Sequence, residues 1–94
     1  MYMRIKDNLM LRKIAGQWIV IPMGDMVVRF NGIISLNETS AFLWRRLEEG
    51  QSQDMLLQSL RAEYDVEQDV AAQDIQEFLT ELASKGLLET ADET

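Results

Sequence analysis

The hydrophobic pattern of this chain changes its period once, close to residue 36. Before that point, apolar and β-branched residues fall in short runs separated by turn-forming pairs, which is typical of β-strands. After it, apolar residues recur every three or four positions, which is typical of helices with one buried face. A chain that places short strands first and helices afterwards is expected to fold as an α+β domain.

The first two extended runs predict a β-hairpin. Residues 9–14 carry apolar side chains among basic ones and end at Ala15-Gly16, a pair that favours a tight turn. Residues 17–21 read QWIVI, which is rich in aromatic and β-branched side chains. Pro22 ends this second run, because proline has no N–H to donate to a strand ladder.

A third run, residues 26–36, reads MVVRFNGIISL and contains Asn31-Gly32, the strongest short-range turn pair. Either this run forms a small hairpin of its own, or a bend divides it and leaves one strand. We favour the second interpretation, with a third strand near residues 32–36. The three strands would form a small antiparallel sheet.

The first helix is expected at about residues 37–48, with Gly50 as its C-terminal stop. Its start has two candidate caps. Ser35 with Glu38 fits a capping box, in which each side chain satisfies a free backbone N–H group. Asn37 is an equally good cap by itself, so both interpretations stay open.

Two further helices are expected, from about Ser52 to about Asp65 and from about Glu67 to Gly86. The last helix has one apolar stripe, formed by Ala71, Ile75, Phe78, Leu79 and Leu82. Three helices joined by tight turns, with a small sheet covering one side, follow the general plan of a winged helix domain.

The length of 94 residues suits one domain with a modest core. We therefore expect a single domain over residues 1–94, with strands at about 9–36 and helices at about 37–86. Residues 87–88 are expected to pack back onto the domain or to add a short strand. From Thr90 onward the chain is expected to fray.

The chain contains no cysteine and no histidine. These absences remove disulfides, thiolate metal sites, the commonest zinc ligands and every Ser/His/Asp or Cys/His arrangement for nucleophilic catalysis. We therefore expect no enzymatic activity, no metal and no cofactor. The apolar runs are far shorter than the roughly 20 residues that span a bilayer, and the first residues do not resemble a secretory signal. A cytoplasmic protein that does not contact a membrane is expected.

The net charge of −7 is unevenly distributed. Up to Arg46 there are seven basic and three acidic residues, a balance of +4, whereas from Leu47 onward there are two basic and thirteen acidic residues, a balance of −11. An acidic surface repels nucleic acid. A winged-helix DNA reader needs basic residues on its second or third helix, and those helices offer only Arg61 and Lys85. We therefore expect no nucleic-acid partner.

Two sets of side chains are candidates for a site. Asp74, Glu77 and Glu81 share one face of the last helix, where a solvated face, an acidic docking face and, least favoured, a cation site are the alternatives. The aromatic residues could stack on bases, but core packing is the favoured interpretation in so acidic a chain. These residues are Trp18, which is expected to stay partly exposed, and Phe42, Trp44 and Phe78.

A three-stranded antiparallel sheet also leaves an edge with unpaired N–H and C=O groups. Such an edge can accept an extended peptide as an additional strand, with backbone hydrogen bonds supplying affinity and adjacent pockets supplying selectivity. The same edge can pair with a second copy of the chain, so a homodimer through this edge stays open.

Several segments of the sequence resemble one family over about residues 9–89. They are AGQWIVIP, FNGIISLNETSAFLW, EYDV and DIQEFLTELASKGLLE. The family is PqqD, the coenzyme PQQ synthesis protein D type, also known as RiPP recognition elements. The resemblance implies a winged helix-turn-helix protein that binds the leader segment of a ribosomally made precursor peptide. It would deliver this leader to a modifying enzyme, of the radical SAM type in many members.

The resemblance also implies where the leader would bind. It would add as a strand to the third strand of the sheet, at Ile33, Ile34, Ser35 and Leu36. The groove side of the last helix would consist of Ile75, Phe78, Leu79 and Leu82, although these are also core candidates. Asp74 and Glu81, with Glu77 between them, would meet basic leader residues. The alternative function is a winged-helix transcription regulator or a general protein-interaction module.

Overall fold

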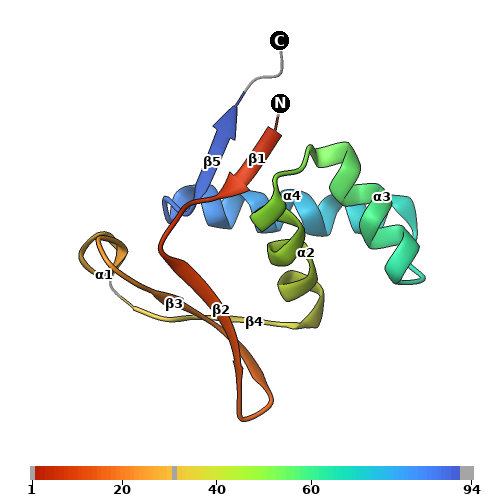
Figure 1. Ribbon diagram of the computed structural model, residues 1–94. Helices are drawn as coiled ribbons and strands as arrows, with labels where there is room; N and C mark the ends of the chain where they lie inside the picture. The colour runs from red at the N-terminus through yellow and green to blue at the C-terminus, as the bar shows by residue number, and fades with distance from the viewer. Residues whose placement is uncertain (1, 31, 92–94) are drawn as a thin grey trace.

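The computed structural model describes residues 2–30 and 32–91 (Figure 1). Within this part of the chain, most strands precede the three long helices in an α+β arrangement, which confirms the expected class. In chain order the elements are β1 (Tyr2–Ile5), β2 (Leu9–Ile14), β3 (Gln17–Pro22), α1 (Met26–Arg29), β4 (Ile34–Leu36), α2 (Glu38–Glu49), α3 (Gln53–Glu63), α4 (Gln68–Ser84) and β5 (Leu88–Ala91).

The expected three-stranded antiparallel sheet is present, with strand order β2-β3-β4. β2 and β3 pair from Leu9 with Pro22 to Ile14 with Gln17. The turn between them consists of Ala15 and Gly16, whose φ angles are 51° and 80°. Positive φ at both central residues matches the right-handed twist of a two-residue hairpin, so the predicted hairpin is confirmed.

The segment before β4 differs from the expected extended run. Residues Met26–Arg29 form the short helix α1, which places the side chain of Met26 in the core. Burial of this apolar side chain at the end of the sheet outweighs the β-propensity of the two valines that follow it. The third strand itself lies at Ile34–Leu36, inside the predicted range, and pairs with β3. Asn31, half of the predicted turn pair, lies outside the described residues.

A second sheet was not predicted. β1 and β5 pair in antiparallel register, from Tyr2 with Ala91 to Ile5 with Leu88. The other edge of β1 pairs with Gln51, since Met3 N donates to Gln51 O at 2.8 Å and Gln51 N donates to Met3 O at 2.9 Å. In β1 the side chains of Met3 and Ile5 lie in the core and the one between them is exposed. The alternation of apolar and polar residues in this segment is a pattern from which the strand could have been predicted.

The end of the chain follows one expectation and contradicts another. Leu87 is fully buried and β5 begins directly after it, which confirms that this segment packs back. Fraying from Thr90 was wrong for Thr90 and Ala91, because both pair with β1. Residues 92–94 lie outside the described part.

The three long helices start and end close to the predicted positions. Asn37 caps α2, accepting a hydrogen bond from Ser40 N at 2.7 Å, whereas Ser35 belongs to β4 and makes no capping box. Ser52 caps α3 in the same way, accepting from Met55 N at 3.2 Å. Gly50 follows α2 with a φ of 88°, a conformation that glycine adopts without strain.

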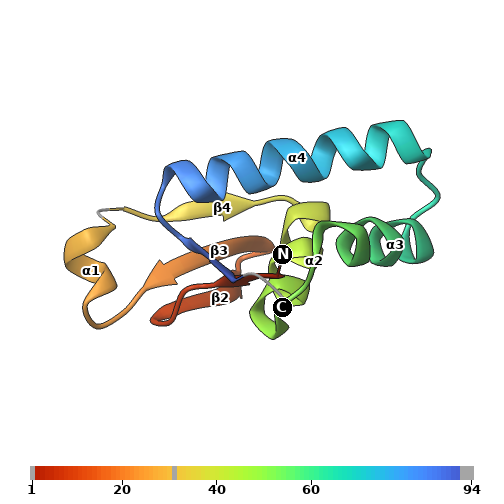
Figure 2. The same ribbon diagram turned by 90° about the horizontal axis from the view of Figure 1, so that it is seen from above.

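The core lies mainly between the three long helices. Figure 1 shows α2, α3 and α4 above the three-stranded sheet, and Figure 2 shows α4 running along the side of the sheet where β4 lies. The largest fully buried side chains are Val20, Leu43, Trp44, Leu47, Leu56, Leu60, Ile75, Leu82 and Leu87. Only Val20 comes from the three-stranded sheet, so this sheet is covered on one face by the helical body.

Candidate functional site

The edge strand β4 is the first part of the candidate site. Among the described residues β4 pairs with β3 alone, so its other edge has no strand partner. This edge is on the side of the sheet along which α4 runs (Figure 2). Unpaired backbone groups on such an edge can accept an added strand.

The side chains of β4 alternate between two environments. Ile34 is buried in the core, and Leu36 packs against it from the same face. Ser35 is exposed on the opposite face, and Ile33, immediately before the strand, is 67% exposed. The four predicted strand residues are therefore brought together. Ile34 and Leu36 anchor the strand, which leaves its backbone edge as the accessible feature.

The predicted groove side of α4 is buried in this structure. Ile75, Phe78, Leu79 and Leu82 are between 0% and 7% exposed and all belong to the hydrophobic core. They pack against the other helices because an amphipathic helix in a small domain has one apolar stripe, and the core takes it. Of these four, Phe78 lines a pocket between α2 and α4, and Ile75 lines a separate pocket beside α3. Their role as direct peptide contacts stays a prediction, and the structure shows Ile75, Leu79 and Leu82 as part of the core.

A pocket of about 250 Å³ lies between the start of α2 and the middle of α4. Its α4 wall consists of Asp74, Glu77, Phe78 and Glu81, and its α2 wall of Asn37, Thr39, Ser40 and Leu43. Three carboxylates thus face a cavity that opens directly after β4. Because Asn37 directly follows β4, the predicted acidic residues lie close to the end of the predicted strand.

The carboxylates of this pocket differ in their partners. Glu81 forms a salt bridge with Lys85 at 3.1 Å, and Glu77 accepts a hydrogen bond from Gln73 at 3.4 Å. Asp74 makes no ion pair or side-chain hydrogen bond with any residue that the structure describes. One nearby cation against three carboxylates leaves the pocket acidic, which favours a basic side chain as its occupant.

The tip of the hairpin carries an arrangement that the sequence reasoning missed. The guanidinium of Arg45 in α2 lies 4.3 Å from the centre of the Trp18 ring, and Lys13 Nζ lies 5.3 Å from it. A cation over an indole ring is attracted by its negative face. This contact connects the half-buried Trp18 to α2. The pairing of Lys13 with Trp18 could have been found by counting outward from the Ala15-Gly16 turn.

The burial of the aromatic side chains agrees with the expected core packing. Trp44 is fully buried and Phe78 is 7% exposed. Phe42 is half-buried, and its ring meets that of Tyr64 edge to face, with 5.7 Å between the centroids. Trp18 is partly exposed, as expected. None of the four forms a continuous stacking platform with the others.

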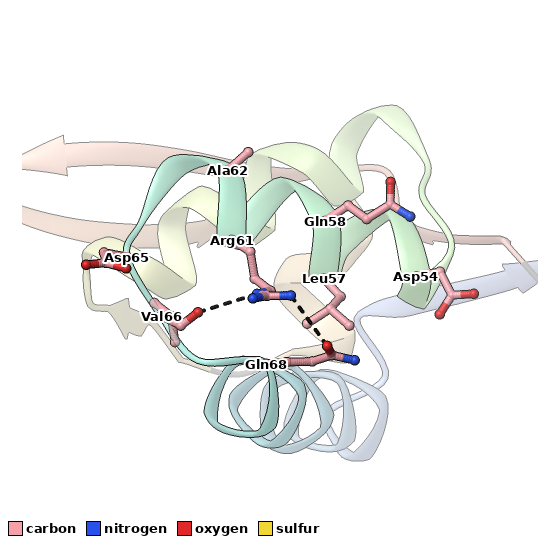
Figure 3. Close-up of a pocket in the computed structure, with 8 residues that line it drawn as sticks. All are labelled: Asp54, Leu57, Gln58, Arg61, Ala62, Asp65, Val66 and Gln68. Carbon is pink, nitrogen blue, oxygen red and sulfur yellow. Dashed lines mark hydrogen bonds between the residues drawn. The ribbon is translucent and has the colours of Figure 1, made fainter.

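A second pocket, between α3 and the start of α4, contains none of the predicted site residues (Figure 3). Here Arg61 donates hydrogen bonds to the backbone oxygen of Val66 and to Gln68 Oε1, both at 3.4 Å. Lys85, the other basic residue of the last two helices, is paired with Glu81. The two basic residues at these helices therefore both contact neighbouring groups of the same chain. Residues 53–85 also carry eight acidic side chains. Nucleic-acid recognition is not favoured by this surface.

Neither a metal site nor a membrane-spanning helix is found in the described part of the chain. No group of three or more His, Cys, Asp or Glu residues there is arranged to hold a metal ion. No described helix has the length and apolar character needed to cross a membrane.

Comparison with known proteins shows to which family the chain belongs. The profile of the family described as Coenzyme PQQ synthesis protein D (PqqD) matches residues 17–88. Because this match spans most of the chain, the chain belongs to the PqqD family, which confirms the resemblance seen in the sequence. None of the curated proteins is significantly similar to it in sequence.

Two solved structures are similar to this chain. The structure of TbiB1 in complex with the TbiA(beta) leader peptide is 24% identical, with a TM-score of 0.75, and the match covers 96% of this chain and 99% of that one. The structure of lasso peptide synthetase B1 complexed with the leader peptide is 25% identical, with a TM-score of 0.72, and the match covers 94% and 98% of the two chains. Both similar proteins were therefore captured with a leader peptide.

Proposed function

We propose that this protein is a non-catalytic adaptor that binds the leader segment of a ribosomally made precursor peptide and delivers it to a modifying enzyme. The observation that carries the proposal is the edge of β4, which has no strand partner among the described residues and is followed by an acidic pocket against α4. Membership of the PqqD family and the two similar leader-bound proteins support the same function.

In this proposal the leader adds as a strand to the free edge of β4. Backbone hydrogen bonds from the Ile33–Leu36 segment supply affinity that depends little on the leader's sequence. Selectivity comes from the pocket, where Asp74, Glu77 and Glu81 favour a basic leader residue and Phe78 contacts its aliphatic part. The buried stripe of Ile75, Leu79 and Leu82 holds α4 in place behind the pocket.

The chemistry would reside in the partner. The chain has no histidine or cysteine, and the acidic pocket offers no activated nucleophile, so binding and presentation are the functions that its residues can perform. We propose a modifying enzyme of the radical SAM type as the partner, and a winged helix-turn-helix domain formed by the whole of residues 1–94. A cytoplasmic location belongs to the same proposal.

The test is a titration of the isotope-labelled protein with leader peptides encoded near its gene, followed through backbone amide shifts. We expect shifts at residues 32–36 and on the exposed face of α4 around Asp74. A leader whose basic residues are replaced by alanine serves as the matched control and should bind more weakly. Shifts at α3 and the hairpin tip alone would contradict the proposed groove, and an absence of shifts with every leader would contradict the function.

The free edge could also pair with a second copy of the chain. In that case the homodimer and the leader would compete for the same backbone groups. Sedimentation of the protein with and without leader distinguishes the two. We expect a monomer that binds one leader, and a dimer that the leader dissociates would show that the edge serves both.

A further inference from the structure

The three-stranded sheet has a second face, which is turned away from the helices. In Figure 1 no described helix or strand lies beneath the sheet. Because side chains alternate along each strand, the pairing register assigns one set to this outer face. The set consists of Met10, Arg12 and Ile14 of β2, Gln17, Ile19 and Ile21 of β3, and Ser35 of β4. Here "outer face" means these seven residues.

The outer face is apolar although no part of the described chain covers it. Four of its seven residues are large aliphatic side chains, and Ile14 is 49% exposed. Met10, Ile19 and Ile21 are only partly buried and take no part in the core cluster. An antiparallel sheet with one solvated face ordinarily alternates apolar with polar residues. The apolar character of the outer face therefore indicates a surface that is covered by a partner.

Arg12 lies within this apolar set and indicates the charge of the partner. It pairs with Ile19 across the hairpin, and Ile19 pairs with Ser35 of β4, so Arg12 has aliphatic neighbours. Its Nε donates to Met10 Sδ at 2.8 Å, and it forms no salt bridge with a described residue. A partner that covers the outer face must desolvate this guanidinium, which requires a carboxylate opposite it.

The same arginine argues against a second copy as the occupant. A symmetric dimer through the outer face would bring two Arg12 side chains toward each other, which costs free energy. The sheet face is also small. Strands of six residues are about 20 Å long and three strands are about 15 Å wide, so the face offers roughly 300 Å², well below the roughly 800 Å² per partner of a stable interface. Such a surface suits a transient contact with another protein.

The geometry points to the outer face as a docking surface for a second folded protein whose contact region is apolar with a carboxylate at its centre. This inference rests on the proposed function, in which that protein is the modifying enzyme. The leader pairs with the backbone edge of β4, whereas the outer face is the surface of the sheet turned away from the helices; the two share only Ser35, whose side chain lies on the outer face. The adaptor can therefore hold the peptide and the enzyme at the same time.

Two neighbouring residues of β2 provide the test. Arg12 and Lys13 are adjacent but face opposite sides of the sheet, so Arg12→Glu and Lys13→Glu change the net charge equally and differ only in the face they alter. The measurement is the affinity of each variant for a purified modifying enzyme encoded beside the gene, with and without leader. We expect at least a tenfold loss for Arg12→Glu and less than a threefold change for Lys13→Glu. Equal losses, no loss, or no association of the unmodified chain with any such enzyme would overturn the inference.

A second pair of variants tests the apolar part. Ile19→Thr keeps a β-branched side chain in the strand while making the outer face polar, and Val70→Thr makes the same kind of change at a side chain of α4 that is 51% exposed. Only Ile19→Thr should weaken the enzyme complex, by about threefold or more. Leader affinity is measured separately, so a failure to bind leader contradicts the proposed function alone. If instead Arg12→Glu dissociates a dimer of the free protein, the occupant is a second copy and the inference is wrong.

Discussion

The helical body and the three-stranded sheet differ in how completely they bury their apolar side chains. α2, α3 and α4 supply most of the fully buried residues, including Trp44, Leu60 and Ile75. The segment from β2 to β4 carries five of the eight large apolar side chains that are exposed in the described part, namely Ile14 of β2 and Met23, Val27, Val28 and Ile33 of the β3–β4 connection. The helical body therefore contributes most of the buried core, whereas the sheet and the connection before β4 keep apolar side chains exposed.

The largest expected effect tests this contrast directly. Leu60→Ala removes a fully buried side chain of α3 and should lower the free energy of unfolding by about 3 kcal/mol, because it leaves a cavity in the core. Ile14→Ala, on the sheet, removes a side chain that is 49% exposed and should cost less than about 1 kcal/mol. Urea denaturation monitored by Trp fluorescence measures both. Equal costs would show that the sheet is as important to stability as the helices.

Proline substitutions in β4 should separate stability from binding. Successive N–H groups of a strand point to opposite edges, so one of Ile34→Pro and Ser35→Pro removes a donor to β3 and the other removes a donor to the leader. The variant that affects the free edge should lose at least tenfold in leader affinity, which is about 1.4 kcal/mol. Calorimetric titration gives the affinity and thermal unfolding shows whether each variant is folded. If both folded variants bind leader normally, the edge of β4 is not the site.

The two helix caps compare a position at the groove with one far from it. Asn37→Ala and Ser52→Ala each leave a helix N-terminus without its side-chain acceptor and should each cost about 1 kcal/mol of unfolding free energy. Asn37 also lines the acidic pocket, whereas Ser52 does not. We expect only Asn37→Ala to change leader affinity as well, as measured by titration at a temperature where both variants are folded. A similar change for Ser52→Ala would indicate a general effect of stability on binding.

The smallest expected effect concerns charge in the groove. Asp74→Asn neutralises a carboxylate that lines the pocket, and Asp69→Asn neutralises one in the first turn of the same helix, away from the pocket. A leader with basic residues should bind Asp74→Asn about threefold more weakly, and the difference should shrink as salt is added, because exposed charges are screened. Asp69→Asn should bind almost as the unmodified protein does. A loss for Asp74→Asn that is independent of salt would exclude an electrostatic role.

Much of the fold could be predicted because it depends on neighbours in the sequence. The hairpin register follows from the Ala15-Gly16 turn, and the start of α3 follows from Ser52, whose acceptor lies three residues from its donor. The pairing of β1 with β5 was missed, since it joins residues at opposite ends of the chain. The helical turn at Met26–Arg29 was read as extended, because only the packing of Met26 into the core selects the helix.

The candidate site, too, could be predicted only where it depends on neighbours in the sequence. The sequence, with the family that it resembles, was sufficient to name the β4 segment and the acidic row of α4, because strand alternation and helical spacing are local properties. It could not assign the stripe containing Ile75, Leu79 and Leu82 to core or to groove, since either would produce the same spacing.

By itself the sequence determined the β2-β3 hairpin with its turn, the order and approximate limits of the three long helices, and the separation of basic and acidic halves. The tertiary structure decided which apolar faces are covered: it buried the stripe of α4, left one edge of β4 unpaired within residues 2–30 and 32–91, and turned the outer face away from the helices. The physical reason is that capping and periodicity act over about four residues, whereas burial of a face depends on segments that are distant in the chain.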